Sequence, residues 1–307
     1  MAVICRPMKA GPFVPEHVTY PIYGQPKYDG WRMLIHQATP FTSRLKEYPN
    51  WHLHNFFAAL PIPMTQLLDG EVAVGDHLAP ECYSLTESAV SSFHGEPNFT
   101  FFVFDSWDST GTLQFDERYA AAKYKVDHLK SPRIKLVENR LLHSYDELLA
   151  YEEEQVTLGY EGIILKSPYG PYKQGRSTSR QCYSIKIKRW KDSEAEIIGY
   201  EELYSNQNEK QVNELGLTKR SSHAANMVPM DTLGALLAKD INPESPFYGV
   251  EFRVGVFKGL TKAQLKEIWD SREKYLGRPF KYQYQPVGGY VKPRIPTWRG
   301  WRGELLL

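Results

Sequence analysis

The chain has 307 residues, a net charge of +1 and 42% hydrophobic residues, which is enough apolar material for a buried core and excludes a wholly disordered chain. The sequence has no apolar run of about 18 residues, so a membrane span is excluded, and the N-terminus lacks the apolar segment of a signal peptide. The three cysteines, Cys5, Cys82 and Cys182, are too few and too far apart for a disulfide framework or a structural zinc site. We therefore expect a cytoplasmic protein without a membrane partner.

The first 190 residues combine strand-like and helix-like patterns. Apolar runs predict strands at Met33–His36, Leu67–Val74, Phe99–Asp105, Gly162–Lys166 and Ser184–Ile187. Helical periodicity predicts helices at Asn50–Leu60 and Phe115–Leu129, and a third that is capped by Ser144 and runs to about Leu158. Strands and helices that mix in this order predict an α+β fold rather than regular βαβ units.

After Trp190 the sequence is dominated by strands. The predicted strands are Glu194–Tyr204, Leu233–Ala238, Tyr248–Phe257 and Phe280–Gln285, and the one predicted helix is Thr261–Tyr275, with Thr261 and Gln264 as a capping box. Four or five strands with one helix fit a small closed β-barrel of the oligonucleotide-binding (OB) type. The sequence therefore predicts two domains, residues 1–190 and 191–307.

Positive charge is concentrated in two segments. Residues 166–191 contain eight Lys or Arg and no Asp or Glu, and residues 272–302 contain eight Lys or Arg against Glu273 alone. One such run is usually a solvated surface. Two of them in a chain of net charge +1 favour a polyanion as binding partner.

The segment Gln25–Arg32 (QPKYDGWR) carries the sharpest chemical pattern. The pattern K-x-D-G-x-R arises by chance in roughly 0.3% of chains of this length, so a functional site is favoured over ordinary surface charge. A lysine such as Lys27 becomes a nucleophile where burial or positive charge lowers its pKa. Gly30 permits close approach of a phosphate, and Arg32 can bind a phosphate or sugar oxygen. The segment therefore predicts nucleophilic catalysis by Lys27.

Together with later segments, this motif resembles the nucleotidyltransferases that form a lysyl–nucleotide intermediate: ATP-dependent DNA ligases, RNA ligases and mRNA-capping enzymes. The matching segments follow in the family's order: Ser43-Arg44, Leu68–Val72, Phe102–Asp105, Glu161–Lys166 and Ile185–Lys188. The segment Pro293–Arg302 (PRIPTWRGWR) resembles the closing segment of small viral and phage DNA ligases, although it lacks the terminal Asp-Lys of the larger enzymes. The resemblance implies an N-terminal nucleotidyltransferase domain, with antiparallel sheets and flanking helices, followed by an OB-fold β-barrel.

The resemblance also implies a catalytic set. Lys27 would attack the α-phosphorus of ATP and expel pyrophosphate, which leaves a lysyl–AMP. Lys186 and Lys188 alternate on one strand and so share a face, where they would neutralise the phosphate in the transition state. Asp29 belongs to the same catalytic set, and Arg44 would bind the 5′-phosphate of the nick.

A nucleotide and metal site is implied as well. Glu71 and Glu161 would bind Mg²⁺ (or Mn²⁺) or the ribose of ATP, because hard cations take oxygen ligands. Phe102 would stack on adenine, with core packing as the alternative for this strand residue. The other residues implied to bind ATP are Gln25, Arg32, which would hold the ribose, and Arg299 and Arg302, which would grip the β- and γ-phosphates or else contact DNA.

We therefore expect an ATP-dependent DNA ligase that seals 3′-OH/5′-phosphate nicks in duplex DNA. We expect a monomer without an obligate protein partner, in the cytoplasm of a bacterium or phage-infected cell. No separate DNA-binding domain precedes the motifs, so the two domains are expected to clamp the duplex themselves. The alternatives are an RNA ligase or GTP-dependent capping enzyme with the same lysine chemistry, and a non-catalytic OB-type nucleic-acid-binding protein. The segment Thr218–His223 is either a flexible loop or a contact to the DNA backbone.

Overall fold

The chain divides into two compact units. The computed structural model describes residues 6–107, 111–212, 218–220, 226–286 and 291–302. Internal contacts define unit 1, Met1–Lys188, and unit 2, Arg189–Leu307, so the division lies two residues before the boundary predicted from the sequence. Within the described ranges, no helix has the length and apolar character needed to cross a membrane.

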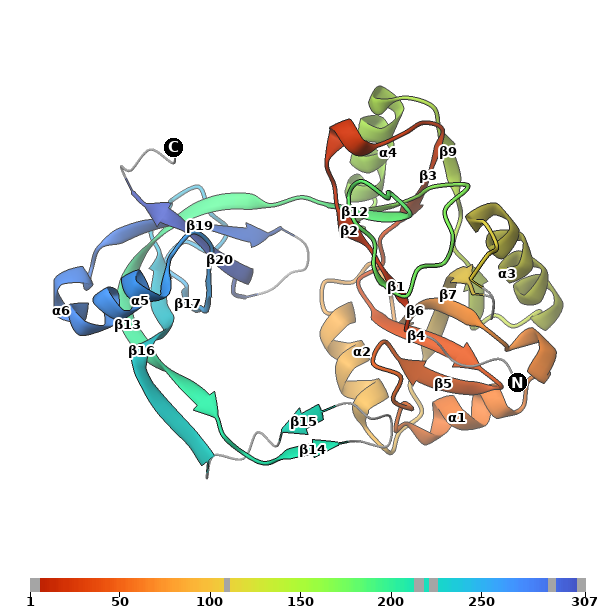
Figure 1. Cartoon of the computed structure of the whole chain (residues 1–307), viewed down its shortest axis with the longest axis horizontal. Helices are drawn as coiled ribbons and strands as arrows, with labels where there is room; N and C mark the ends of the chain where they lie inside the picture. Colours follow the sequence, from red (N-terminus) through yellow and green to blue (C-terminus); the bar gives the residue numbers. More distant parts are fainter. Residues whose placement is uncertain (1–5, 108–110, 213–217, 221–225, 287–290, 303–307) are drawn as a thin grey trace. The chain divides into compact units, whose positions relative to one another are not determined.

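Unit 1 is built on two five-stranded sheets (Figure 1). Sheet 1 has the order β5-β4-β6-β7-β8 and is antiparallel except for β7–β8. Its strands are β4 (Trp31–His36), β5 (Thr39–Thr42), β6 (Leu68–Val74), β7 (Phe99–Ser106) and β8 (Ile134–Leu136).

Sheet 2 has the order β2-β12-β10-β3-β9 and is antiparallel except for β12–β2. Its strands are β2 (Gly11–Pro12), β3 (Ile22–Pro26), β9 (Arg140–Leu142), β10 (Gly162–Lys166) and β12 (Ser184–Lys188). A separate parallel pair joins β1 (Met8–Lys9) to β11 (Gly175–Arg176). These short parallel pairs connect the beginning of the unit to its end.

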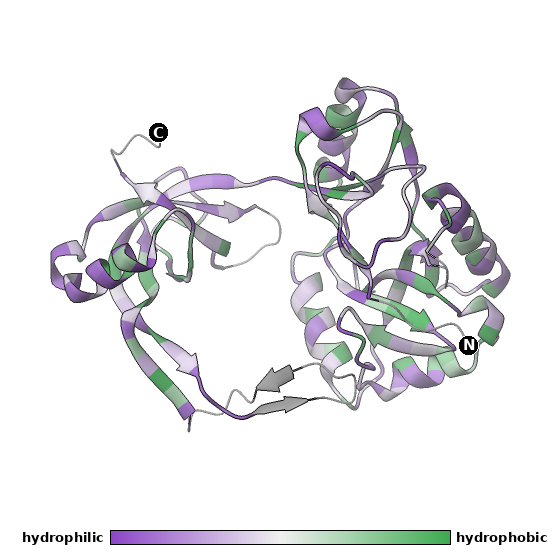
Figure 2. Cartoon of the chain, viewed as in Figure 1, coloured by the Kyte–Doolittle hydropathy of each residue, from purple (hydrophilic) through white to green (hydrophobic). Residues whose placement is uncertain are grey.

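Helices cover the sheets of unit 1. They are α1 (Trp51–Ala58), α2 (Cys82–Ser91), α3 (Phe115–Leu129) and α4 (Tyr145–Thr157), with 3₁₀ turns η1 (Pro15–His17) and η2 (Ile62–Met64). Phe57 of α1, Val90 of α2 and Val126 of α3 share one buried cluster with the strands of sheet 1. Leu148 and Tyr151 of α4 pack against sheet 2. The helices thus bury apolar residues against the sheets, and Figure 2 shows that much of the rest of α3 is hydrophilic.

The helix starts of unit 1 follow from local side-chain chemistry. Asn50 caps α1 by accepting a hydrogen bond from the Leu53 N–H at 3.1 Å, and Ser144 caps α4 by accepting one from the Glu147 N–H at 3.2 Å. Such caps satisfy N–H groups that have no partner inside the helix. All five strands and three helices predicted for this part of the chain are present. Helix α2 and seven strands were not predicted, namely β1, β2, β3, β5, β8, β9 and β11.

Unit 2 is a six-stranded sheet with the order β17-β16-β13-β19-β20-β18 and two short helices. Its elements are β13 (Lys191–Asn206), β16 (Met227–Asp240), β17 (Glu251–Val254), β18 (Val256–Phe257), α5 (Lys262–Asp270), α6 (Arg272–Tyr275), β19 (Pro279–Gln285) and β20 (Arg294–Trp301). The predicted capping box of Thr261 and Gln264 opens α5, and Ile268 of that helix is buried with Phe252 and Tyr282 of the sheet.

The closed barrel predicted for unit 2 is not formed by the described residues. The two end strands, β17 and β18, are not hydrogen-bonded to each other. They are consecutive pieces of the chain, separated by Gly255 alone. Because one pairs with β16 and the other with β20, the two edges of the sheet meet end to end at Gly255 instead of side by side.

Two further segments of unit 2 differ from the predictions. The closing segment forms strand β20, in which Trp298 is buried and stacks on Phe280 with ring centroids 4.8 Å apart. The predicted loop at Thr218–His223 begins with a strand: β15 (Thr218–Arg220) pairs with β14 (Lys210–Val212). Residues 221–223 lie outside the described ranges.

Buried polar groups join the two sheets of unit 1. The carboxylate of Asp105 on β7 is fully buried and accepts hydrogen bonds from Arg118 Nε of α3 and Lys166 Nζ of β10, each at 2.9 Å. Gln25 Nε2 of β3 donates to the Phe104 carbonyl of β7 at 3.1 Å. Because Lys166 and Gln25 belong to sheet 2 while Asp105 and Phe104 belong to sheet 1, these bonds set how the sheets face each other.

Replacement of Arg118 tests this network. Arg118 is 1% exposed and also donates to the carbonyls of Leu113 at 2.7 Å and Gly170 at 2.8 Å. Arg118→Leu removes these hydrogen bonds and leaves part of the Asp105 charge unpaired, so we expect a loss of about 3–5 kcal/mol in the free energy of unfolding. Urea denaturation followed by circular dichroism measures it.

The matched control is Arg140→Leu, which breaks an exposed ion pair with Glu154 and should change stability little. Equal midpoints for the two variants would show that the buried network does not stabilise unit 1.

Candidate active site

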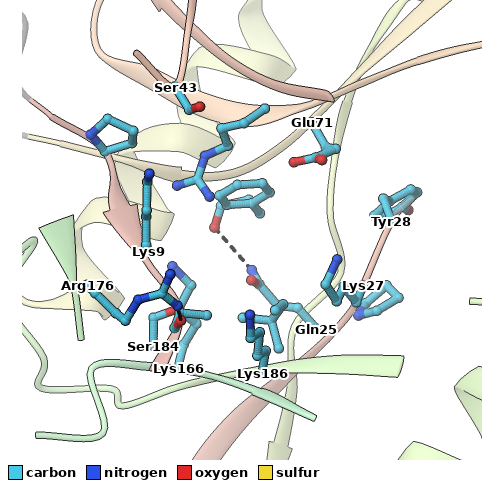
Figure 3. A pocket seen from close by; sticks show the side chains of 16 residues that line it. Lys9, Gln25, Lys27, Tyr28, Ser43, Glu71, Lys166, Arg176, Ser184 and Lys186 are labelled. Atoms are coloured by element: carbon cyan, nitrogen blue, oxygen red, sulfur yellow. Dashed lines mark hydrogen bonds between the residues drawn. The ribbon is translucent and has the colours of Figure 1, made fainter. Parts of the chain in front are cut away.

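A cavity of about 290 Å³ opens between the two sheets of unit 1. One wall comes from β3, β10 and β12 of sheet 2, and the other from β4, β6 and β7 of sheet 1. Figure 3 shows side chains from both walls directed toward the space between them. The lining residues are Pro7, Lys9, Ala10, Gln25, Pro26, Lys27, Tyr28, Arg32, Ser43, Glu71, Phe104, Ile164, Lys166, Arg176, Ser184 and Lys186.

Lys27 lies at the end of β3 and forms an ion pair with Glu161, which directly precedes β10. The second carboxylate oxygen of Glu161 accepts from Lys188 Nζ. The backbone holds the same residues together, because the Lys27 N–H donates to the Gly162 carbonyl at 2.9 Å and the Glu161 N–H donates to the Lys27 carbonyl at 3.2 Å. Lys27, Glu161 and Lys188 thus form one ionic cluster beside the cavity.

This cluster sets the protonation of Lys27. Burial lowers the pKa of the Lys27 ammonium, but the carboxylates of Glu161 and Glu71 outweigh that effect and leave its pKa raised. Burial likewise raises the pKa of Glu161, but Lys27 and Lys188 outweigh it and leave this pKa lowered. In this state Lys27 is a protonated amine held by its counter-ion, and it must lose a proton before it can act as a nucleophile.

Further cations line the cavity. Burial, followed by the charges of Arg176 and Lys27, lowers the pKa of Lys186. Among the described residues, neither Lys186 nor Lys9 has an ion pair. Lys166 is paired with Asp105. An anion that enters the cavity therefore meets cations whose charge is not already neutralised.

Lys9 and Arg176 were not predicted as site residues. The parallel ladder of β1 and β11 aligns Lys9 with Arg176, and the Arg176 guanidinium donates to the Ala10 carbonyl at 3.0 Å. Figure 3 shows this pair across the cavity from Lys27. The sequence signal was weak, because these residues are far apart along the chain and only their pairing brings them together.

Arg32, predicted to hold the ribose, is already bonded within unit 1. Its Nε and Nη2 donate to the two carboxylate oxygens of Asp69, both at 2.6 Å, and Tyr172 Oη donates to the same carboxylate at 2.6 Å. Burial lowers the pKa of Arg32, but Asp69 outweighs it and leaves that pKa raised. The guanidinium carbon also lies 4.5 Å from the ring centroid of Phe104. Arg32 thus forms part of the cavity wall in a fixed orientation.

Phe102, predicted to stack on adenine, does not line the cavity. It is 4% exposed and stacks on Tyr28, with ring centroids 4.1 Å apart. Phe104 lies two residues further along β7, on the same face of the strand, and does line the cavity. Of the two rings in this motif, Phe104 therefore lies at the cavity, and Phe102 packs against Tyr28.

The described residues contain no group of three or more His, Cys, Asp or Glu side chains arranged around a metal. Glu161 does not fit a metal ligand here, because both of its oxygens are bonded to ammonium groups. Glu71 does fit: it lines the cavity, and no described side chain hydrogen-bonds its carboxylate. Mg²⁺ keeps most of its ligands as water and phosphate oxygens, so one carboxylate is sufficient.

The remaining predicted residues lie outside the cavity walls. Asp29 lies in the turn between β3 and β4, beside Gly30, which is pressed so closely on β6 that a Cβ would lie 2.3 Å from the Val72 carbonyl oxygen. Arg44 is exposed and lines a second cavity, which shares Arg32 and Ser43 with the first. The structure thus places Arg44 next to the Lys27 cavity.

Arg299 and Arg302 belong to unit 2. Arg299 lies in β20 and lines a polar cavity together with Glu194 and Lys281. Arg302 directly follows β20, and its Nε lies 3.1 Å from the Glu194 carboxylate. To bind a phosphate, Arg302 would have to exchange this carboxylate for it.

A cavity that combines a lysine amine, a carboxylate and several cations has the groups needed for nucleophilic catalysis at a phosphate. The family model of the ATP dependent DNA ligase domain matches residues 7–188, more than half of the chain. The chain belongs to the ATP-dependent DNA ligase family, which confirms the resemblance seen in the motifs.

Solved structures of DNA ligases match nearly the whole chain. The structure of a Chlorella virus DNA ligase-adenylate is 25% identical and covers 99% of this chain and 100% of that one, with a TM-score of 0.54. A structure from an analysis of Lig E DNA ligases is 20% identical and covers 98% of this chain and 100% of that one, with a TM-score of 0.70. These likenesses and the observed sheets confirm the predicted α+β fold class.

One curated relative is a Mycolicibacterium vanbaalenii protein named Probable DNA ligase. It is 28% identical over 165 residues, which make up 49% of this chain and 30% of that protein. This chain therefore spans less than a third of that relative's length.

Glu71 provides a test of the electrostatics of the site. Burial raises the pKa of Glu71 to about 7, against the opposing effect of Lys27. A carboxyl whose pKa is raised on folding stabilises the fold while protonated, and this contribution is lost as the pH rises from about 4.5 to 7. Glu71→Gln should therefore stabilise unit 1 at pH 8, on the order of 1–3 kcal/mol, and have almost no effect at pH 5. Thermal unfolding at the two pH values measures this, and an equal gain at both would contradict it.

Proposed function

We propose that the protein is an ATP-dependent DNA ligase that seals nicks in duplex DNA through a lysyl–AMP on Lys27, and that it acts as a monomer in the cytoplasm. Residues 1–190 would form the adenylyltransferase domain and residues 191–307 the OB domain. The observation that carries the proposal is the cavity itself, in which the β1–β11 pair places Lys9 and Arg176 across from Lys27. This arrangement suits a nucleoside triphosphate, because the leaving pyrophosphate develops negative charge on the side away from the nucleophile, where these two cations lie.

In the first step, Lys27 Nζ loses a proton and attacks the α-phosphorus of ATP. A phosphorus–nitrogen bond forms while the bond to the bridging oxygen breaks, and pyrophosphate leaves with that electron pair. Lys186 lines the cavity and Lys188 shares Glu161 with Lys27, so their charges favour loss of the Lys27 proton and stabilise the phosphate in the transition state. Mg²⁺, held by Glu71, would supply further neutralisation of phosphate charge.

The base would bind against the apolar part of the cavity. Phe104 and Ile164 supply apolar surface. The Gln25 amide nitrogen is occupied by the Phe104 carbonyl, which leaves the amide oxygen to accept from an amino group. Adenine carries its exocyclic amino group where guanine carries a carbonyl oxygen, so this acceptor favours ATP over GTP.

In the second step, an oxygen of the 5′-phosphate at the nick attacks the lysyl–AMP, and the phosphorus–nitrogen bond breaks. In the third, the 3′-hydroxyl attacks the activated 5′-phosphate and AMP leaves. Arg44, on the cavity that adjoins the Lys27 site, would bind the 5′-phosphate. DNA binding would rest largely on the two basic segments and weaken steeply with salt.

Nucleotide labelling separates this proposal from its alternatives. The protein is incubated with Mg²⁺ and ATP or GTP labelled at the α-phosphate, and then offered nicked DNA, nicked RNA or capped-RNA precursors. The proposal expects a label from ATP that chases into sealed DNA. A label from GTP, sealing of RNA alone, or no label at all would contradict it.

Lys27→Ala should abolish covalent AMP labelling, because it removes the attacking amine. It should retain much of the sealing of a pre-adenylylated nick, since that step needs no lysine nucleophile. The covalent adduct is measured on a denaturing gel. An AMP adduct on another residue of the variant would show that Lys27 is not the nucleophile.

The closing strand would act on the phosphates of ATP, and Arg299→Ala combined with Arg302→Ala tests this. The double variant should slow lysyl–AMP formation about tenfold or more, because the β- and γ-phosphates are present only in the first step. Sealing of a pre-adenylylated nick should change less. Single-turnover rates at one salt concentration measure both steps. Normal lysyl–AMP formation with weak binding to nicked DNA would assign these arginines to DNA instead.

A further inference from the structure

A cluster of four aromatic side chains lies beside the Lys27–Glu161 ion pair and has no part in the mechanism above. The Tyr28 ring stacks on Phe102 at 4.1 Å and meets the Tyr160 ring edge-on at 5.2 Å. The His77 ring lies 5.3 Å from Tyr28, 4.9 Å from Phe102 and 5.9 Å from Tyr160. Nε2 of His77 is also 3.5 Å from the Tyr160 hydroxyl. We call these four residues the aromatic cluster.

The aromatic cluster is connected to the nucleophile through two dipeptides. Lys27–Tyr28 and Tyr160–Glu161 lie side by side, joined by the backbone hydrogen bond from the Glu161 N–H to the Lys27 carbonyl. The charged member of each dipeptide enters the ion pair. The aromatic member of each enters the cluster. The same two pieces of backbone are therefore held by an ion pair and by a ring contact.

Phe102 and His77 anchor this arrangement to sheet 1. Phe102 is buried on β7, and His77 lies in the connection between β6 and α2. Neither His77 nor Tyr160 lines the Lys27 cavity. Their contacts can therefore affect Lys27 only through the backbone and through Tyr28.

We propose that the aromatic cluster positions Lys27 for attack on the α-phosphorus, with Tyr160 and His77 as positioning residues. A lysine side chain has four rotatable bonds, and its ion pair with Glu161 must open before attack. During that change the ring contacts keep the backbone of Lys27 in register with Glu161. A displacement of about 1 Å at a nucleophile can reduce the rate about a hundredfold, so even partial loss of this support should be measurable.

This inference rests on the proposed function, and three full-length variants test it. Tyr160→Leu removes the ring, and Tyr160→Phe retains it. Tyr124→Leu is the matched control, because the exposed Tyr124 ring contacts His128 within α3, with ring centroids 3.9 Å apart, and does not line the Lys27 cavity. Single-turnover lysyl–AMP formation is measured over a range of ATP concentrations, alongside sealing of a pre-adenylylated nick.

Tyr160→Leu should lower the maximal rate of lysyl–AMP formation about tenfold, with the Kd for ATP within about twofold of the wild-type value. Its sealing of a pre-adenylylated nick should be unchanged. Tyr160→Phe and Tyr124→Leu should match the wild type in both assays. This division between rate and affinity separates positioning from a general loss of structure.

Several results would overturn the inference. These are a wild-type rate for Tyr160→Leu, an equal defect in Tyr160→Phe, a defect confined to the Kd for ATP, and an equal loss in all steps. If Tyr160→Leu does not fold, His77→Ala tests the inference instead. The His77 side chain is 29% exposed, so this variant is expected to fold. A slower adenylylation of His77→Ala at unchanged Kd supports the inference, and a wild-type rate overturns it. Absence of lysyl–AMP in the wild type would instead overturn the proposed function.

Discussion

The hydrogen bond between Asp105 and Lys166 crosses from one sheet of unit 1 to the other, and the cavity depends on it. A fully buried carboxylate is costly unless it is paired and hydrogen-bonded, and Asp105 meets that condition through Lys166 and Arg118. The bond from Gln25 to the Phe104 carbonyl makes a second crossing nearby. These bonds hold the two walls of the cavity at a defined spacing, because moving the walls apart would leave the buried Asp105 carboxylate without Lys166.

At the other end of the cavity, one carboxylate and two lysines determine each other's protonation. Glu161 serves two lysines at once, Lys27 and Lys188, so the carboxylate stays ionised and Lys27 stays protonated in this state. Such a resting state protects an otherwise reactive amine. An incoming polyanion competes with Glu161 for the same cations. Lys186 and Lys9 have no ion pair among the described residues, so they provide a place where the polyanion can bind first. In the proposed first step, ATP would thus separate the Lys27 ammonium from Glu161, and loss of the Lys27 proton would follow.

The resemblance of the motifs to those of a known family was sufficient to predict that Lys27, Glu71 and Lys186 line one site, although strand β3, which Lys27 follows, was not predicted. They could not decide between Phe102 and Phe104, since residues two apart on a strand share a face and the cavity covers only one end of that face. Strand β20 was missed because Pro296 within it is atypical of a strand. The pairing of Lys9 with Arg176 depends on contacts distant in sequence, for which no local pattern exists.

The parallel pairs at the start of unit 1 bear on how the chain is made. Strand β1 pairs with Gly175–Arg176, and strand β2 pairs with Ile185–Lys186. The partner of each early strand is therefore synthesised more than 160 residues later. A ribosome adds roughly 5–20 residues per second, which leaves the first strands without partners for about ten seconds or more. Sheet 2 of unit 1 is therefore complete only when its last strand has been synthesised, and a chain interrupted before Gly175 would lack both strand β12, which bears Lys186, and the ladder that holds Lys9.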